Sequence, residues 1–370
     1  MNYSMISYIL GWIFNFEAAF MILPGITAII YREKNGLAFL ITMLICLTIG
    51  IPLTRRKRKS KVFHAKEGAV TVALSWLVLS IAGALPFIIS GSIPHPIDAI
   101  FETVSGFTTT GASILNNVEA LSHCMLIWRS FTHWIGGMGV LVFFLAIIPS
   151  AHKGEGYSLH LLRAESPGPS VNKMVPRMRD TATALYRIYV VLTVINIVLL
   201  LLSGMKPFDS FCIAFGTAGT GGFAVLNSGC AEYTPMAQWI TTVFMLLFGI
   251  NFNLYFLLLM KNVKGFFKNE ELRNYLGIVA AAIVLITINI MNLYGGVLPA
   301  FRYAAFQVVS VITTTGFVTA NFDLWPEFSK TILLLLMVVG ACAGSTGGGM
   351  KVSRIMILGR TITKEMRQIL

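Results

Sequence analysis

A short motif of threonine and glycine occurs three times in this chain, each time between two long apolar stretches. The copies are Thr108-Thr109-Thr110-Gly111, Gly219-Thr220-Gly221-Gly222 and Thr313-Thr314-Thr315-Gly316. Their final glycines follow one another after 111 and 94 residues, so the repeating unit is an apolar stretch, a short loop and a second apolar stretch. One isolated copy is typical of a turn, but three copies in the same context indicate a repeated pore loop.

The residue types of the motif suit a loop that presents oxygen atoms to a cation. Glycine lets the backbone turn neighbouring carbonyls in one direction, and threonine adds a hydroxyl oxygen. Rings of such oxygens replace the hydration shell of a cation in potassium-selective filters. The first and third copies also share a hydrogen-bonding side chain nine residues before the glycine and a serine six before it, whereas the second copy has diverged: Glu102 and Ser105, Gln307 and Ser310, Ile213 and Gly216.

The composition places the chain in a membrane. Of its 370 residues, 56% are hydrophobic and only 12% are charged, which is incompatible with a soluble globule. Five cysteines without CxxC spacing indicate neither a disulfide framework nor a zinc site. No catalytic constellation is visible, because the six histidines do not pair with a nucleophile and no carboxylate pair recurs on one face. We therefore expect neither an enzyme nor a covalently bound cofactor.

Apolar runs predict about eight membrane-spanning helices. They cover residues 6–31, 37–53, 68–90, 123–149, 184–203, 236–260, 274–295 and 329–358. The fold class is therefore an all-α integral membrane protein. The first run has no cleavage site after it and is expected to be a retained span.

The basic residues predict the orientation of these spans. A run at 55–61 follows the second span and places 54–66 in the cytoplasm. The segments then predicted inside carry 21 Lys and Arg, against 5 in those predicted outside. The N-terminus is therefore expected inside and all three motif loops outside. Beside a span, the basic run favours this interpretation over binding to nucleic acid, and the net charge of +12 has the same origin.

Two charged residues lie inside predicted spans, where an ionised side chain is costly. Glu17 has either a packing role or a role on the ion path, and packing is favoured. Arg129 needs acceptors, and Glu102 or carbonyl ends of the first pore loop are candidates. We expect Arg129 to brace the loop rather than contact the ion, because a positive charge on the conduction path would repel a cation.

A short apolar piece precedes the motif in each outer segment, as at 96–101 and 207–211. Proline suits a first helical turn, and the aspartate that follows suits the positive end of the helix dipole. These pieces are expected to be half-helices whose negative ends face the cation. Acidic residues of the segment 91–122 either attract cations or only keep the surface soluble, and the sequence leaves both interpretations open.

The chain resembles the Trk/Ktr/HKT superfamily of potassium transporters, and its bacterial Trk branch most closely. The resemblance rests on five motifs in the family's order: SGFTTTGAS, WRSFTHWIGGMG at 128–139, GTAGTGGFAVLNSG, VITTTGFVTANFDLWP and GACAGSTGGGMKVSRI at 340–355. It runs along nearly the whole chain. It implies repeated helix–pore loop–helix units around a pseudo-fourfold pore, and glycine at each visible filter position is similar to the family's potassium-selective pattern.

The resemblance also implies the site residues. Filter positions are Thr109, Thr110, Gly111, Thr220, Gly221, Gly222, Thr314, Thr315 and Gly316, supported by Arg129, Glu102 and Gln307. The glycine run at 340–349 cannot hold a stable helix, lacks the lysine position of a phosphate-binding loop, and is implied to be an intramembrane gate. Its residues are Gly340, Ala343, Gly344, Ser345, Thr346, Gly347, Gly348 and Gly349.

The implied protein takes up potassium, the only metal ion expected, through a cell membrane, in a bacterium. The implied assembly is a homodimer in the lipid bilayer on a cytoplasmic nucleotide-binding regulatory subunit, with no nucleic acid bound. Two alternatives stay open: a truncated, non-conducting subunit that assembles with or regulates longer relatives, and a secondary cation transporter with broken helices.

The expected organisation follows the repeats. Residues 1–66 hold two N-terminal transmembrane helices and a basic loop, 67–150 the first pore repeat, and 151–183 a cytoplasmic connector. The second repeat is expected at 184–261 and the third, with the gate, at 262–370. The family's fourth repeat has no counterpart in the 370 residues, and we expect the sequence to be a fragment or a truncated paralogue.

Overall fold

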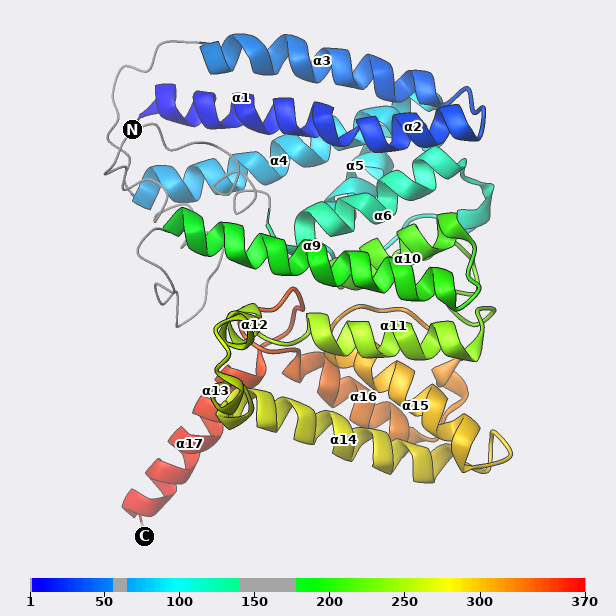
Figure 1. Ribbon diagram of the computed structural model, residues 1–370, viewed down its shortest axis with the longest axis vertical. Coiled ribbons are helices and arrows are strands. Elements are labelled where there is room, and N and C mark those ends of the chain that lie inside the picture. Colours follow the sequence, from blue (N-terminus) through cyan, green and yellow to red (C-terminus); the bar gives the residue numbers. More distant parts are fainter. Residues whose placement is uncertain (1, 56–64, 140–177, 370) are drawn as a thin grey trace. The chain divides into compact units, whose positions relative to one another are not determined.

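The computed structural model describes residues 2–55, 65–139 and 178–369, and these residues form helices and loops without any strand (Figure 1). The chain divides into two compact units, Met1–Arg187 and Ile188–Leu370. The predicted all-α membrane fold is confirmed in these parts. Most of the basic run at 55–61 and the connector at 151–183 lie outside the described residues.

The first unit contains two N-terminal spans followed by a long helix, a short helix and a further helix. These elements are α1 (Tyr3–Phe20), α2 (Ile22–Ile30), α3 (Gly36–Arg55), α4 (Ala65–Ser90), α5 (Pro96–Phe107), η1 (Val118–Ala120) and α6 (His123–Gly137). Helices α1 and α2 form one span with a break at Met21. The short helix α5 contacts both α4 and α6, so the first motif is held between two longer helices.

The second unit repeats this order twice. Its elements are α9 (Met178–Leu202), which begins at the end of the first unit, α10 (Pro207–Gly219), α11 (Pro235–Phe248), α12 (Phe252–Leu259), α13 (Val263–Lys268), α14 (Glu270–Ile290), α15 (Val297–Ile312), η2 (Phe322–Leu324), α16 (Glu327–Val339) and α17 (Val352–Ile369). The short helices α10 and α15 each precede a motif, as α5 does in the first unit.

Five described helices are long and apolar enough to cross a membrane: Tyr3–Ile30, Gly36–Arg55, Lys66–Ser90, Ala182–Leu202 and Glu270–Ile290. They confirm five of the eight predicted spans. The predicted continuous helix at 236–260 is wrong, because α11 and α12 meet at an angle of 91°. Only the first part of the span predicted at 123–149 lies among the described residues, as α6.

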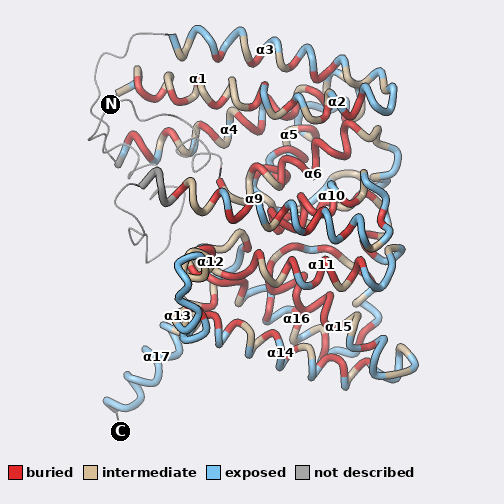
Figure 2. The backbone as a smooth tube through the Cα atoms, in the orientation of Figure 1, coloured by how far each residue is buried: buried red, intermediate tan, exposed pale blue. Residues whose placement is uncertain are grey.

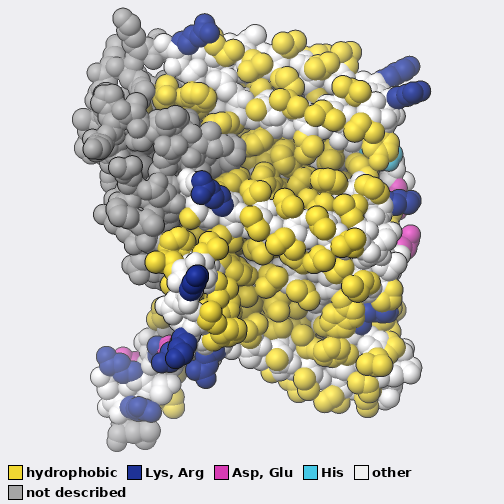
Figure 3. Space-filling model, viewed as in Figure 1, with side chains coloured by type: hydrophobic (Ala, Val, Ile, Leu, Met, Phe, Trp, Pro, Cys, Tyr) yellow, Lys and Arg dark blue, Asp and Glu magenta, His cyan; other side chains and the backbone are white. Residues whose placement is uncertain are grey.

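Burial separates the short helices from the long ones (Figure 2). In α5, α10 and α15 most of the C-terminal residues are buried, whereas the long spans expose large apolar side chains such as Ile29, Leu202 and Leu285. Hydrophobic side chains cover most of the described surface drawn in Figure 3. An exposed surface of this kind is stable against lipid tails and not against water. The C-terminal parts of the short helices therefore lie inside their units, while their first turns keep exposed side chains such as Ile97 and Leu298.

Candidate functional site

Each motif begins where a short helix ends. Helix α5 ends at Phe107, α10 ends at Gly219 and α15 ends at Ile312. The predicted half-helices are therefore confirmed. Helices α5 and α10 start with proline and carry Asp98 or Asp209 in the first turn, as predicted, whereas α15 has no acidic residue there. The C-terminal end of a helix carries a partial negative charge, so each motif lies at a position that attracts a cation.

The three motifs share one backbone conformation. The threonine two residues before the final glycine has a positive φ in every copy, as does the glycine itself. The φ angles are 55°, 52° and 57° for Thr109, Thr220 and Thr314, and 76°, 80° and 84° for Gly111, Gly222 and Gly316. A positive φ is uncommon for a β-branched residue and costs of order 1–3 kcal/mol. Three such residues at one motif position indicate that the surrounding structure imposes the conformation for a shared purpose.

The same hydrogen bond closes each motif onto its helix. The residue before the final glycine donates its N–H to a carbonyl five residues earlier, from Thr110 to Ser105 at 2.9 Å, from Gly221 to Gly216 at 3.0 Å and from Thr315 to Ser310 at 2.9 Å. The acceptor is a main-chain oxygen, so the diverged second copy keeps the bond without a serine.

Threonine hydroxyls pair across the first and third motifs. The Oγ1 atoms of Thr108 and Thr110 are 2.8 Å apart, and those of Thr313 and Thr315 are also 2.8 Å apart. The second copy has glycines at both positions. The divergence therefore removes a hydroxyl pair but leaves the backbone of the loop unchanged.

The second and third motifs lie side by side in the second unit. A Cβ atom added to Gly222 would overlap the carbonyl oxygen of Thr315. Beyond the motifs, the N–H of Cys230 donates to the carbonyl of Val318 at 2.8 Å. Glycine is required at 222 by this contact as well as by its positive φ. The first motif belongs to the first unit and has the same local geometry there.

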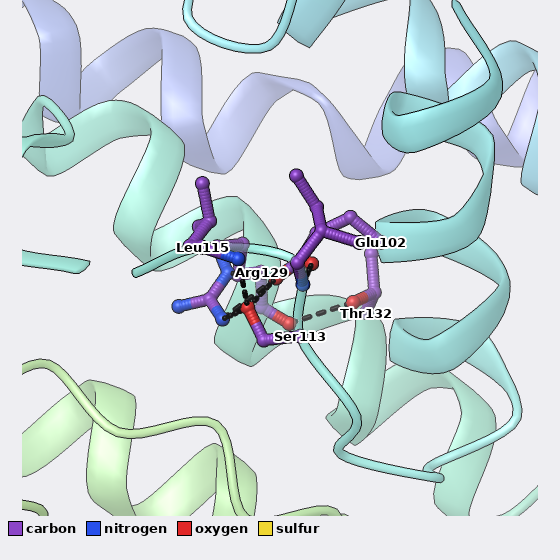
Figure 4. A network of polar contacts seen from close by, with 6 residues as sticks. Glu102, Ser113, Leu115, Arg129 and Thr132 are labelled. Carbon is purple, nitrogen blue, oxygen red and sulfur yellow. Dashed lines mark hydrogen bonds and ion pairs between the residues drawn. The ribbon is translucent and has the colours of Figure 1, made fainter. Parts of the chain in front are cut away.

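A buried ion pair stands behind the first motif, as predicted (Figure 4). Arg129 of α6 contacts Oε1 of Glu102 of α5 with an Nη atom at 2.7 Å and with Nε at 2.8 Å, and the two side chains are 2% and 0% exposed. Ser113 donates its hydroxyl to the same Oε1 at 2.9 Å, and the N–H of Ile114 donates to Oε2 at 3.1 Å. The pair therefore joins two helices to the extended segment that follows the motif. Sequence reasoning missed Ser113 and Ile114, for which the spacing gave no signal.

The corresponding residue of the third repeat makes no such network. Gln307 is buried, with 2% of its surface exposed, but its Oε1 has no hydrogen-bond partner within the parts that the structure describes. Here Ser310 holds the loop instead, because its hydroxyl donates to the carbonyl of Phe317 at 2.6 Å. Glu17 is fully buried against protein, close to Gly83, rather than directed at lipid.

The glycine run at 340–349 forms the loop that was predicted between two helices. Helix α16 ends at Val339 and α17 begins at Val352. Gly340 and Gly349 both have positive φ, and a Cβ on either one would collide with the backbone of the other end of the loop. The loop therefore returns on itself, and only residues without a side chain permit its two ends to meet.

This loop contacts the third motif directly. The N–H of Gly348 donates to Oγ1 of Thr314 at 2.6 Å. A Cβ on Gly347 would lie 2.8 Å from the carbonyl oxygen of Thr313. The loop thus sits against the start of the motif, on the side of the helix end.

The break between α11 and α12 holds the other side of the loop, which sequence reasoning missed. Three hydrogen bonds make the contacts with the break: Thr346 Oγ1 to the carbonyl of Phe248 at 3.2 Å, Cys342 N–H to that of Gly249 at 3.1 Å, and Phe252 N–H to that of Gly344 at 2.9 Å. A fourth, from Ala343 N–H to Oε1 of Glu271 at 2.6 Å, joins the loop to α14. Ser345 bonds within the loop, to the carbonyl of Cys342 at 2.6 Å. Glycine and asparagine at 249–251 were the available turn signal.

The atoms that these loops can offer to a cation as ligands are carbonyl and hydroxyl oxygens, which suit an alkali cation. Among the described residues no group of three or more His, Cys, Asp and Glu side chains could hold a metal ion. Neutral oxygens bind a cation without trapping it, which conduction requires.

Comparisons with known proteins agree with this geometry. A family model described as TrkH, cation transport protein, matches residues 35–369. The chain is 39% identical over 376 residues to the Trk system potassium uptake protein TrkH of Escherichia coli strain K12, covering 100% of this chain and 77% of that protein. It is 31% identical over 371 residues to the Trk system potassium uptake protein TrkG of the same strain, covering 97% and 74%.

A solved structure is similar over the whole chain. The crystal structure of the potassium transporter TrkH from Vibrio parahaemolyticus matches with a TM-score of 0.86 and 33% sequence identity. The match covers 100% of this chain and 77% of that one.

Proposed function

The chain belongs to the TrkH family of cation transport proteins, and on that premise we propose that it takes up potassium across the cell membrane through a filter built from its three motifs. The family consists of transporters, so the activity is transport rather than catalysis, and no covalently bound cofactor takes part. The observation that supports the filter is the backbone geometry common to the three motifs: the same two positive φ angles and the same closing hydrogen bond.

The filter residues are those at which this geometry recurs. We assign the potassium-binding oxygens to Thr109, Thr110 and Gly111, to Thr220, Gly221 and Gly222, and to Thr314, Thr315 and Gly316. Arg129 and Glu102 support the first loop through their buried ion pair. Gln307 is assigned to the third loop by position. The helix ends behind the motifs add negative potential where the ion is dehydrated.

The gate is the loop at 340–349. It is bonded on one side to Thr314 of the filter and on the other to the break between α11 and α12. A loop in that place narrows the path below the filter, and its glycines let it change shape. The family resemblance further supports a homodimer on a cytoplasmic nucleotide-binding regulatory subunit, with the N-terminus inside and the pore loops outside.

The function is tested by exchanging the glycine of the first motif. Gly111→Ser adds a side chain at a φ of 76°, so the adjoining carbonyl turns away from the ion. In liposomes we expect sodium flux to rise relative to potassium flux. Gly91→Ser is the matched control, because Gly91 has a φ of 73° in a turn after α4, with no atom near its Cβ position. If the two variants had the same potassium-to-sodium selectivity, the assignment of Gly111 to the filter would be wrong.

A further inference from the structure

A groove between the start of α14 and helix α17 has no role in the function proposed above. Its volume is about 560 Å³, many times the roughly 30 Å³ that one water molecule takes up in the liquid. Three basic side chains line it, Arg360, Lys364 and Arg367, together with the polar Asn274 and Thr363. The groove is thus a recess with basic side chains and partly apolar walls, which include Met356 and Gly359.

The groove lies at the boundary between membrane and water. Helix α14 is a membrane span that begins at Glu270, and Asn274 in its second turn lines the groove. Side chains at the first turns of a span are at the depth of the lipid headgroups. The side of the groove formed by α14 therefore lies at the height of lipid phosphates.

Helix α17 is amphipathic in the way that membrane-surface helices are. Its exposed apolar side chains Leu358, Ile362 and Met366 recur every four residues, so they form one stripe. The basic side chains of the groove begin two residues later, at Arg360, which turns them by about 200° to the opposite side. An apolar stripe paired with a basic one is typical of helices that lie at the lipid surface.

The charge around the groove is strongly positive. The segments 261–273 and 351–369 contain nine Lys and Arg and three acidic residues. Glu270 pairs with Arg360 at 2.7 Å, Glu271 is bonded to the gate loop, and Glu365 is on α17 itself. Within the described parts of the chain, Lys364 and Arg367 have no carboxylate within ion-pair distance. Figure 3 shows these Lys and Arg side chains gathered over α13 and α17.

We propose that this groove binds the phosphate headgroup of an anionic phospholipid, with Lys364 and Arg367 as the charged contacts. Arginine and lysine both bind phosphate oxygens strongly when other charges do not compete for them. The apolar stripe of α17 favours a membrane lipid over a soluble phosphate, since a lipid supplies acyl chains next to its headgroup. Lipid binding in this groove does not depend on ion transport through the proposed filter.

The test is lipid binding by the purified protein. Native mass spectrometry in detergent counts the phosphatidylglycerol and phosphatidylcholine molecules retained during a titration with each lipid. A basic residue near an anionic surface contributes about fivefold in affinity, so Lys364→Gln/Arg367→Gln is expected to bind phosphatidylglycerol about 30-fold more weakly. The matched control, Lys34→Gln/Lys206→Gln, removes two exposed lysines from loops outside the groove. It should bind phosphatidylglycerol as the unchanged protein does.

Three results would overturn the proposal. The groove variant could keep its preference for phosphatidylglycerol, the control could lose as much affinity as the groove variant, or millimolar inorganic phosphate could displace the lipid, which would identify a site for soluble phosphate. If the two variants have equal melting temperatures, a loss of lipid binding is not caused by unfolding. A failure of potassium transport with lipid binding intact would contradict only the function proposed above.

Discussion

Replacing Arg129 should lower the free energy of unfolding strongly, because it leaves the buried carboxylate of Glu102 without its charged partner. The guanidinium and the Glu102 carboxylate are 2% and 0% exposed and 2.7 Å apart. In Arg129→Leu, the donors left to Glu102 among the described residues are the hydroxyl of Ser113 on Oε1 and the N–H of Ile114 on Oε2. Removing one partner of a buried ion pair leaves an uncompensated charge and costs about 3–5 kcal/mol.

A second variant separates the charge effect from a simple loss of packing. The third repeat has the uncharged Gln307 at the position of Glu102, and its helix α16 contains no arginine. The double variant Glu102→Gln/Arg129→Leu therefore gives the first repeat the same lack of charge at these positions. We expect it to be more stable than either single variant, because the unpaired charge is gone.

The assay is the unfolding midpoint in detergent, followed by potassium and sodium flux in liposomes. Lys330→Gln serves as the control, because it breaks the exposed pair with Glu327, in which the side chains are 33% and 87% exposed. Exposed pairs contribute about 1 kcal/mol at most. The reasoning is refuted if Arg129→Leu unfolds no earlier than the control, or if the double variant is no more stable than Arg129→Leu.

Three further predictions concern the filter, the gate and the outer loops. Gly222→Ala should abolish potassium flux, since its Cβ would overlap a carbonyl of the third motif, whereas Gly277→Ala on α14 meets no atom and should leave flux unchanged. Thr314→Val removes the acceptor of the gate loop and should raise flux without a regulator, and Thr314→Ser should restore the closed state. Burial raises the pKa of Glu33, but N–H donors of Cys124 and His123 outweigh it and hold that pKa below its usual value. Because the folded pKa is below the unfolded value of about 4.3, ionised Glu33 stabilises the fold at pH values above about 4.3. This stabilisation is lost as the pH falls through the folded pKa. Between about pH 6 and pH 3 the melting temperature of Glu33→Gln should therefore fall less than that of the unchanged protein.

The features that could be predicted from the sequence are those that require particular residue types at particular positions. An arginine in an apolar helix requires an acceptor, and Glu102, in the preceding outer segment, was among the candidates named. The short helices before the motifs were visible because proline and aspartate mark a helix start. The glycine run at 340–349 was visible because so many glycines cannot continue a helix.

The features that the sequence did not predict depend on contacts between distant segments. Hydropathy stays high across 236–260 despite the glycine and asparagine at 249–251, so it could not reveal a bend of 91°. That bend follows from the glycine loop of the third repeat, which takes up the hydrogen bonds that a straight helix would make internally. The position of Gln307 matched that of Glu102, yet no arginine faces it from the next helix of its own repeat, and the matching network does not form.

The threonines with positive φ show most clearly that local sequence does not determine a conformation imposed by packing. Threonine favours extended backbone, so no propensity assigns a φ of 55° to Thr109. Its neighbours impose that angle, through the closing bond to Ser105 and the helix end before it. Repetition singled out the motif as a candidate site, but its backbone conformation depends on the packing around it.

The stability of the closed form of the proposed gate follows from the hydrogen bonds that hold the loop. Among the described residues, five hydrogen bonds join the loop at 340–349 to Thr314, to the break between α11 and α12, and to Glu271 of α14. Each contributes about 0.5–1.5 kcal/mol net, so breaking all five costs about 5 kcal/mol. Moving a two-state equilibrium from 1:99 to 99:1 takes about 5.5 kcal/mol. A regulator that binds the open form several thousand-fold more tightly than the closed form can therefore open this loop, and loss of a single bond, as in Thr314→Val, should shift it only partway.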